Sequence, residues 1–183
     1  MKLGIIGLPQ SGKTTIFNAL TGGSKPVGQL AGGGRFEVTQ AVVPVPDERV
    51  DKLSAMFKPK KTIRAHVTYA DIAGLEEGAG KAGFSGPLLN QLATMDGLIH
   101  VIRAFENPSI PHPSGSVNPA RDKSNVEADL LLNDLVAVER KLERLADDLR
   151  KGGVKDKALI QREQALFTRL HEALSAEKPL REL

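Results

Sequence analysis

The sequence predicts an α/β fold that carries a helical hairpin toward its C-terminal end. Over residues 1–105, short apolar runs typical of buried strands alternate with segments whose apolar residues recur at helical spacing. The first of these runs leads through a glycine-containing turn straight into a helical segment. From about residue 125 the pattern changes to apolar residues at steps of three and four, which is typical of a coiled coil.

The composition is that of a globular protein with an aliphatic core. Hydrophobic residues make up 40% and charged residues 26% of the 183 positions, whereas aromatic residues make up 4%. The lack of cysteine excludes disulfides and thiolate metal sites. A net charge of +3 permits contact with nucleic acid without arguing for it. No run of 18 apolar residues and no cleavable leader occur, so we expect a cytoplasmic protein that does not enter a membrane.

The first two thirds of the chain hold the alternating elements. In chain order, the predicted strands are KLGIIG, VTQAVVPV, AHVTYADIAG and GLIHVIRAF. The predicted helices are TTIFNALTG, DERVDKLSAMF with Asp47 as its N-cap, and PLLNQLATM. Glycine-rich loops are predicted over residues 22–34 and 74–86, and a long irregular connection over residues 106–124.

The last third predicts two helices that pair as an antiparallel coiled-coil hairpin, interrupted by Gly152 and Gly153. The apolar seam of the first consists of Ala128, Leu131, Leu135, Val138, Leu142, Leu145 and Leu149, and that of the second of Ile160, Phe167, Leu170 and Leu174. We therefore expect a nucleotide-binding part over residues 1–124, a hairpin over 125–178 and a short connection over 179–183.

The turn after the first strand carries the strongest chemical signal. Residues 7–14 read GLPQSGKT, which fits G-x-x-x-x-G-K-[ST] between a strand and a helix. In such a loop the backbone N–H groups surround phosphate oxygens, Lys13 meets the β- and γ-phosphates, and Thr14 offers a hydroxyl to Mg²⁺. The residues predicted to bind nucleotide are Pro9, Gln10, Ser11, Gly12, Lys13, Thr14 and Thr15. A chance glycine turn is the plain alternative.

A second motif follows a later strand. Asp71-Ile72-Ala73-Gly74 fits D-x-x-G, in which the aspartate would belong to the Mg²⁺ shell and the Gly74 N–H would meet the γ-phosphate. By itself this pattern is weak, because an aspartate often caps a loop. Together with the phosphate loop upstream, it predicts that Asp71 and Thr14 are the metal ligands and that Gly74 takes part in catalysis.

Several stretches over nearly the whole chain resemble the YchF or Obg-like ATPase family of P-loop NTPases. They are GLPQSGKTTIFNALTG, VVPVPDERVDKL, KPKKT, DIAGL, HVIRAFENP, HPSGSVNPARD and VEADLLLNDL. The resemblance implies a partial Ras-like sheet with an inserted coiled-coil hairpin, ATP or GTP with Mg²⁺ as ligands, and an N-terminal portion of a longer protein. It also implies a ribosome or RNA partner for the hairpin, although by themselves the mixed charges there are better explained by a solvated helix face.

The same resemblance bears on hydrolysis. Ras-type enzymes orient the attacking water with a glutamine, whereas this chain has Leu75 at that position. The family is proposed to use a histidine instead, and that position matches His112. A histidine can transfer protons near neutral pH. An exposed, solvated His112 in a proline-rich loop is the alternative.

Two departures leave questions open. The usual switch I threonine falls opposite Arg35, so either Mg²⁺ is coordinated without that hydroxyl or Thr39 substitutes for it. The second glycine loop also departs, with Gly83-Phe84-Ser85-Gly86 in place of the family's Gly-Leu-Gly-Asn. The second departure predicts that the second glycine loop, switch II, closes differently from that of the family.

No N-K-x-D or N-x-x-E motif occurs, so the choice between ATP and GTP stays open, as does the oligomeric state. We weigh a Mg²⁺-dependent NTP-hydrolysing switch against a non-hydrolysing module that holds nucleotide while its hairpin docks a partner. A third expectation is that this portion is inactive by itself.

Overall fold

The computed structural model describes residues 1–23, 38–72, 84, 86–151 and 156–183. It divides into two compact units, of which the first ends at Asp122 and the second runs from Lys123 to Leu183. None of the described helices has the length and apolar character that a membrane crossing requires.

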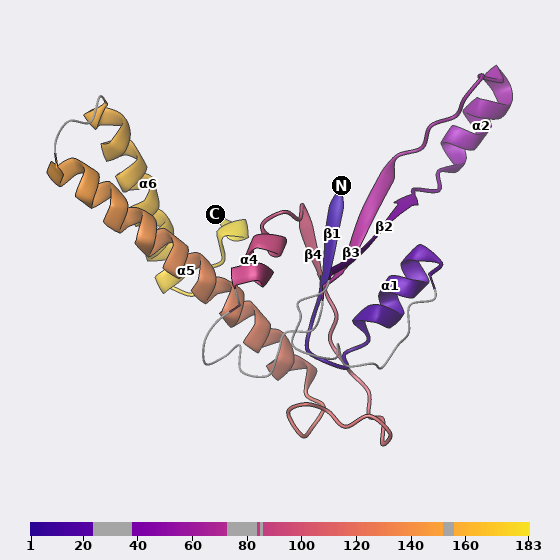
Figure 1. Ribbon diagram of the computed structural model, residues 1–183, viewed down its shortest axis with the longest axis horizontal. Coiled ribbons are helices and arrows are strands. Elements are labelled where there is room, and N and C mark those ends of the chain that lie inside the picture. The colour runs from indigo at the N-terminus through magenta and orange to yellow at the C-terminus, as the bar shows by residue number, and fades with distance from the viewer. Residues whose placement is uncertain (24–37, 73–83, 85, 152–155) are drawn as a thin grey trace. The chain divides into compact units, whose positions relative to one another are not determined.

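The first unit is built on a four-stranded sheet (Figure 1). Its strands are β1 (Lys2–Ile6), β2 (Val38–Pro44), β3 (His66–Ile72) and β4 (Gly97–His100), in the order β2-β3-β1-β4. Strand β1 runs parallel to β3 and β4, whereas β2 is antiparallel to β3. The carboxyl ends of the three parallel strands therefore meet at one edge, which is where ligands bind in open α/β sheets.

The first three predicted strands and the first helix are confirmed, the fourth strand is confirmed in part, and together they form the core. Helix α1 (Lys13–Thr21) follows β1 and ends at Gly22, whose φ of 64° is the left-handed conformation favoured by glycine. Ile5, Phe17 and Val101 form the buried cluster between helix and sheet, with Ala41, Tyr69 and Ile99 packed around it. The core is thus mainly aliphatic, as the composition predicts.

The fourth strand is shorter than predicted. We expected a strand through residue 105, but β4 ends at His100, and Val101 makes one more bond from its N–H to the Ile6 carbonyl at 2.8 Å. Its partner β1 ends at Ile6, which pairs with His100, so the ladder stops there. Beyond that point the Arg103 guanidinium donates to carbonyls of its own loop.

Helix α2 (Glu48–Phe57) is confirmed with the predicted N-cap, since the Asp47 side chain accepts from the Arg49 N–H at 2.9 Å. It stands between β2 and β3, and Figure 1 shows it beyond the end of these strands. The helix ends at Lys58, which has a left-handed backbone with φ of 42°. No residue of α2 is buried, so the sheet does not cover its apolar side chains.

Helix α4 (Gly86–Leu92) confirms the third predicted helix and buries Leu88. Helix α5 (Pro119–Lys151) begins earlier than the predicted hairpin, because Asn118 caps it and Pro119 suits the first helical position. The Asn118 side chain accepts from the Arg121 N–H at 3.0 Å.

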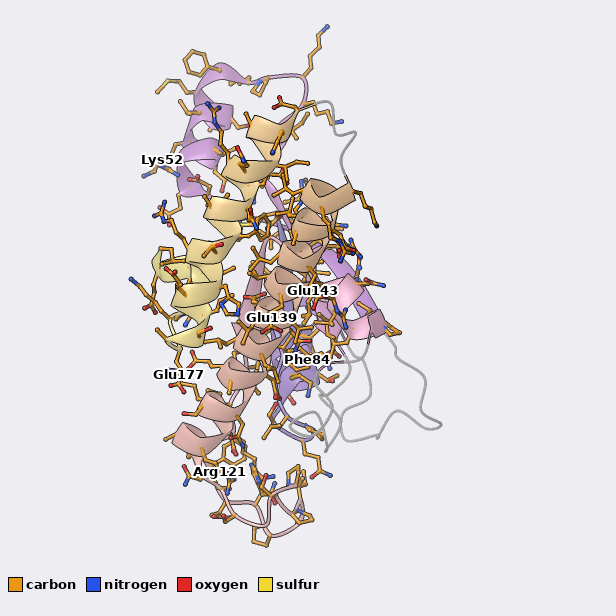
Figure 2. The ribbon with its side chains drawn as sticks, turned by 90° about the vertical axis from the view of Figure 1, so that its left-hand side faces the viewer. Lys52, Phe84, Arg121, Glu139, Glu143 and Glu177 are labelled. Carbon is orange, nitrogen blue, oxygen red and sulfur yellow. The ribbon has the colours of Figure 1, made fainter. Side chains whose placement is uncertain are left out.

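In the second unit, α5 continues beside α6 (Lys157–Ser175), which is followed by the short 3₁₀ helix η1 (Leu180–Glu182). Lys141 Nζ lies 2.8 Å from Glu163 Oε2, and Glu139 lies 3.4 Å from His171. Val138, Leu145 and Leu174 are buried members of the predicted seams. Glu139 and Glu143 mark the middle of α5 in Figure 2. The coiled-coil character of the pair stays a prediction.

Candidate nucleotide-binding site

The loop between β1 and α1 has the backbone that a phosphate-binding loop requires. Gly7, Gln10 and Gly12 have φ values of 151°, 61° and 99°, which residues that carry a side chain rarely adopt. A Cβ at Gly7 would lie 2.3 Å from the Val101 carbonyl oxygen and 2.9 Å from Ser11 Oγ. The chain therefore needs glycine at position 7 both for its backbone conformation and for its close packing against Val101, directly after β4.

Lys13 at the start of α1 is held inside the loop. Its side chain is buried, with only 7% of the residue exposed, and Nζ donates to the carbonyls of Gly7 at 3.0 Å and Leu8 at 2.7 Å. Burial lowers the pKa of Lys13 to about 8, and the negative charge of Asp71 opposes this effect. A phosphate can replace the two carbonyls as the partner of this ammonium group.

Thr14 and Asp71 come together from separate elements. Thr14 Oγ1, in the first turn of α1, donates to Asp71 Oδ2 near the end of β3 at 3.0 Å. Asp71 is buried, so its carboxylate is fixed beside the loop. The register also places Thr39 of β2 directly opposite Asp71, which brings the alternative switch I hydroxyl next to the predicted metal site.

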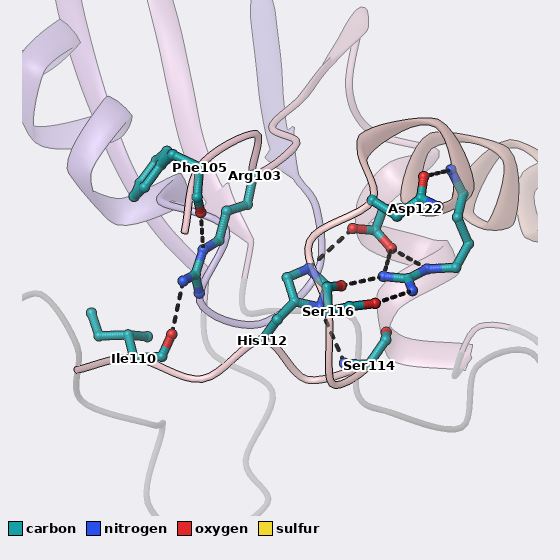
Figure 3. Close-up of polar contacts among 9 residues, drawn as sticks. Arg103, Phe105, Ile110, His112, Ser114, Ser116 and Asp122 are labelled. Atoms are coloured by element: carbon teal, nitrogen blue, oxygen red, sulfur yellow. Dashed lines mark hydrogen bonds and ion pairs between the residues drawn. The ribbon is translucent and has the colours of Figure 1, made fainter. Parts of the chain in front are cut away.

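His112 is buried rather than exposed and takes part in a polar network (Figure 3). The Ser114 N–H donates to His112 Nδ1 at 3.2 Å, and His112 Nε2 lies 3.0 Å from Asp122 Oδ2. Asp122 also accepts from Arg121 Nε at 2.9 Å. The solvated alternative for His112 is therefore wrong.

Arg103 and Asp122 are buried charged residues that sequence reasoning missed. Arg103 donates from Nε to the Phe105 carbonyl at 3.0 Å and from Nη2 to the Ile110 carbonyl at 2.8 Å, as Figure 3 shows. Together with His112 and the loop residues Leu8 and Ser11, they surround a narrow gap that is too small to hold a water molecule. Two features of the sequence could have indicated these residues: Arg103 interrupts an apolar run, and Asp122 lies in the first turn of α5.

Part of the predicted site lies outside the described residues. The structure does not describe Gly74, the candidate γ-phosphate contact, nor Leu75 and Arg35. The structure brings Lys13, Thr14 and Asp71 together, and it places His112 beside the same narrow gap as Ser11. Within the described ranges, no group of three His, Cys, Asp or Glu side chains could hold a metal by itself.

The lowered pKa of Lys13 predicts that nucleotide binding takes up a proton at alkaline pH. With a pKa of about 8, Lys13 is mostly neutral at pH 9, and a bound γ-phosphate would restore its charge. We expect uptake approaching one proton per nucleotide at pH 9. At pH 6.5, where Lys13 is already charged, this contribution should vanish. Calorimetric titration in two buffers of different ionisation enthalpy measures both values, and equal uptake at the two pH values would contradict the assignment.

This fold and loop define the class of P-loop nucleoside triphosphate-binding proteins. The family described as 50S ribosome-binding GTPase matches residues 2–151. The chain belongs to this family, within its YchF and Obg-like ATPase branch.

Individual relatives show the extent of the similarity. The "Ribosome-binding ATPase YchF" of Escherichia coli O157:H7 is 42% identical over 159 residues, which cover 85% of this chain and 42% of that protein. The protein of the same name from Bacillus subtilis is 35% identical over 182 residues, covering 97% of this chain and 48% of that protein. The solved structure of the Schizosaccharomyces pombe YchF GTPase is 32% identical, has a TM-score of 0.77, and is matched over 100% of this chain and 49% of that one. The chain thus spans less than half the length of each.

Proposed function

We propose that this chain binds and hydrolyses a purine nucleoside triphosphate, ATP or GTP, in a Mg²⁺-dependent manner, as part of a ribosome-associated switch in the cytoplasm. The observation that carries the proposal is the convergence of Lys13, Thr14 and Asp71 at the carboxyl edge of the sheet. Family membership supports hydrolysis, and the names of the bacterial relatives support the ribosome as partner.

The residues present fit a magnesium ion. Thr14 Oγ1 and Asp71 Oδ2 are hard oxygen donors 3.0 Å apart, which is the spacing of neighbouring ligands in one coordination shell. Mg²⁺ uses few protein ligands and keeps waters and phosphate oxygens, in agreement with so small a donor set. When bound, the ion would neutralise charge on the β- and γ-phosphates. Lys13 would supply a positive charge to the same phosphates.

His112 is the candidate for proton transfer or water orientation, with Gly74 as the candidate γ-phosphate contact. Both nitrogens of the His112 ring already have partners, in Ser114 and Asp122. Contact with a water at the phosphate therefore requires that the ring exchange one of these partners. Its burial beside the P-loop residues Leu8 and Ser11 supports a role in the site.

The alternative is a non-hydrolysing module whose helical hairpin docks a partner. Leu75 favours it, because a leucine side chain cannot orient an attacking water. In this alternative the buried His112 would only fasten the loop that precedes α5.

Phosphate release by the full chain distinguishes the two functions. With Mg²⁺ and γ-labelled ATP or GTP, we expect release that EDTA abolishes and that Thr14→Ala slows by roughly 10- to 100-fold, since a charge-assisted contact is lost. Thr21→Ala, at the far end of α1, is the matched control. Ribosomes are added in a parallel series. Bound nucleotide without phosphate release in either series would contradict the proposed hydrolysis by this chain.

A further inference from the structure

Residues 45–65, here called the α2 arm, form a projection that the rest of the first unit leaves uncovered. A bond from the Val45 N–H to the Ala65 carbonyl at 2.8 Å closes its base, above the pairing of β2 with β3. The hydroxyls of Ser54 and Thr62, 2.6 Å apart, and an ion pair between Asp51 and Arg64 join the helix to the returning segment. The arm is thus a folded element that is stabilised by its own hydrogen bonds and ion pair.

The tip of the arm, residues 56–63, combines exposed apolar side chains with lysines. Met56, Phe57 and Ile63 are 72%, 73% and 71% exposed. Three lysines and no acidic residue lie among them, in the segment MFKPKKTI. The surface is therefore both apolar and strongly basic, which is the composition of a binding surface rather than of an ordinary solvated turn.

The charge of the arm is concentrated at this tip. Residues 45–65 hold six basic and three acidic residues, an excess equal to the net +3 of the whole chain. Arg49 and Arg64 are paired with Asp47 and Asp51 nearer the base. Among the residues that the structure describes, no carboxylate pairs with the tip lysines Lys58, Lys60 and Lys61. Lys52 also extends away from α2, as Figure 2 shows.

The cations of the helical hairpin are different, because several have acidic partners. Lys141 pairs with Glu163, and Arg150 and Lys151 both pair with Asp147. A polyanion would have to compete with these carboxylates on the hairpin but not at the tip of the arm. The tip is therefore the better candidate for contacts to phosphates.

We propose that the tip of the α2 arm binds unpaired RNA of the ribosome, with lysine contacts to phosphates and Phe57 stacked on a base. The inference rests on the proposed ribosome association and assigns the tip of the arm as the surface that binds the ribosome. RNA is favoured over an acidic protein because lysine is depleted at protein interfaces, whereas arginine is enriched there. Lysines around an exposed aromatic ring are typical of sites for single-stranded nucleic acid.

The test compares the full chain with two arm variants and one hairpin variant. K58Q/K60Q/K61Q removes the tip charge, F57A removes the stacking ring, and K141Q/K151Q/K157Q removes the same charge from the hairpin. Binding is measured by cosedimentation with 70S ribosomes and by fluorescence anisotropy with a labelled oligo(U) at several salt concentrations. Circular dichroism and nucleotide binding confirm that each variant is folded.

We expect K58Q/K60Q/K61Q to weaken oligo(U) binding by about tenfold or more at 0.1 M salt and to reduce the salt slope by about 2. F57A should weaken it by roughly tenfold with little change of slope. Both should reduce ribosome binding more than the hairpin variant does.

If the unaltered chain does not sediment with ribosomes, the proposed ribosome association fails first. If the unaltered chain sediments with ribosomes and the arm variants bind ribosomes and oligo(U) equally well, the RNA inference is wrong. It is also wrong if the arm variants lose ribosome binding while the unaltered chain does not bind oligo(U).

Discussion

Replacement of Lys13 by alanine is expected to lower the affinity for Mg²⁺-ATP and Mg²⁺-GTP by roughly a hundredfold or more. A hydrogen bond to a charged group contributes about 1.5–3 kcal/mol, and Lys13 Nζ makes two bonds to the loop that phosphate oxygens would replace. Burial already disfavours its charge in the nucleotide-free protein. The alanine variant should therefore stay folded while it loses binding, as measured by anisotropy of a fluorescent nucleotide.

Lys52→Ala is the matched control, since Lys52 lies exposed on α2. It should bind nucleotide as the unaltered chain does. Affinity within threefold of the unaltered chain in Lys13→Ala would remove the basis for placing the triphosphate in the loop.

Replacement of Asp122 by alanine is expected to destabilise the first unit by about 3–5 kcal/mol, because it leaves buried polar partners without their carboxylate. Asp122 lies 3.0 Å from His112 Nε2 and accepts from Arg121 Nε at 2.9 Å. Such a loss is comparable to much of the stability of a domain, which is about 5–15 kcal/mol. Asp122→Asn should be milder, since an amide oxygen can still accept one of these bonds.

The measurement is urea unfolding followed by the fluorescence of Tyr69, the single tyrosine in a chain without tryptophan. Tyr69 lies in β3, so it reports on the first unit alone. Asp51→Ala is the control, because Asp51 also pairs with an arginine of the first unit but is exposed, and a change below about 1 kcal/mol is expected. An unchanged midpoint in Asp122→Ala would show that the network around His112 contributes little to folding.

The strands, the first three helices and the phosphate loop could be predicted because their signals are local. Residues 7–14 specify their own turn, and alternating apolar patterns specify β2 and β3. The contact between Thr14 and Asp71 could also be predicted, since strands that run parallel in one sheet end at the same edge.

The burial of His112 could not be predicted, because it depends on a partner contributed by the first turn of α5. The early end of β4 depends on where its partner β1 ends, and the loop that follows is closed by Arg103. Both are outcomes of tertiary packing in a proline-rich connection, where local patterns carry little information. The same limit applies to α2, whose apolar spacing predicted a helix correctly but gave no sign that its apolar side chains would stay exposed.

Lys58 shows a conflict between local stability and interaction. It ends α2 with a left-handed backbone, which costs a residue with a side chain roughly 1–2 kcal/mol and costs glycine almost nothing. Glycine would therefore suit the backbone better, yet the position carries a lysine of the tip that pairs with no carboxylate of the described residues. A side chain kept where the backbone opposes it is typical of a surface selected for what it contacts rather than for how well it folds.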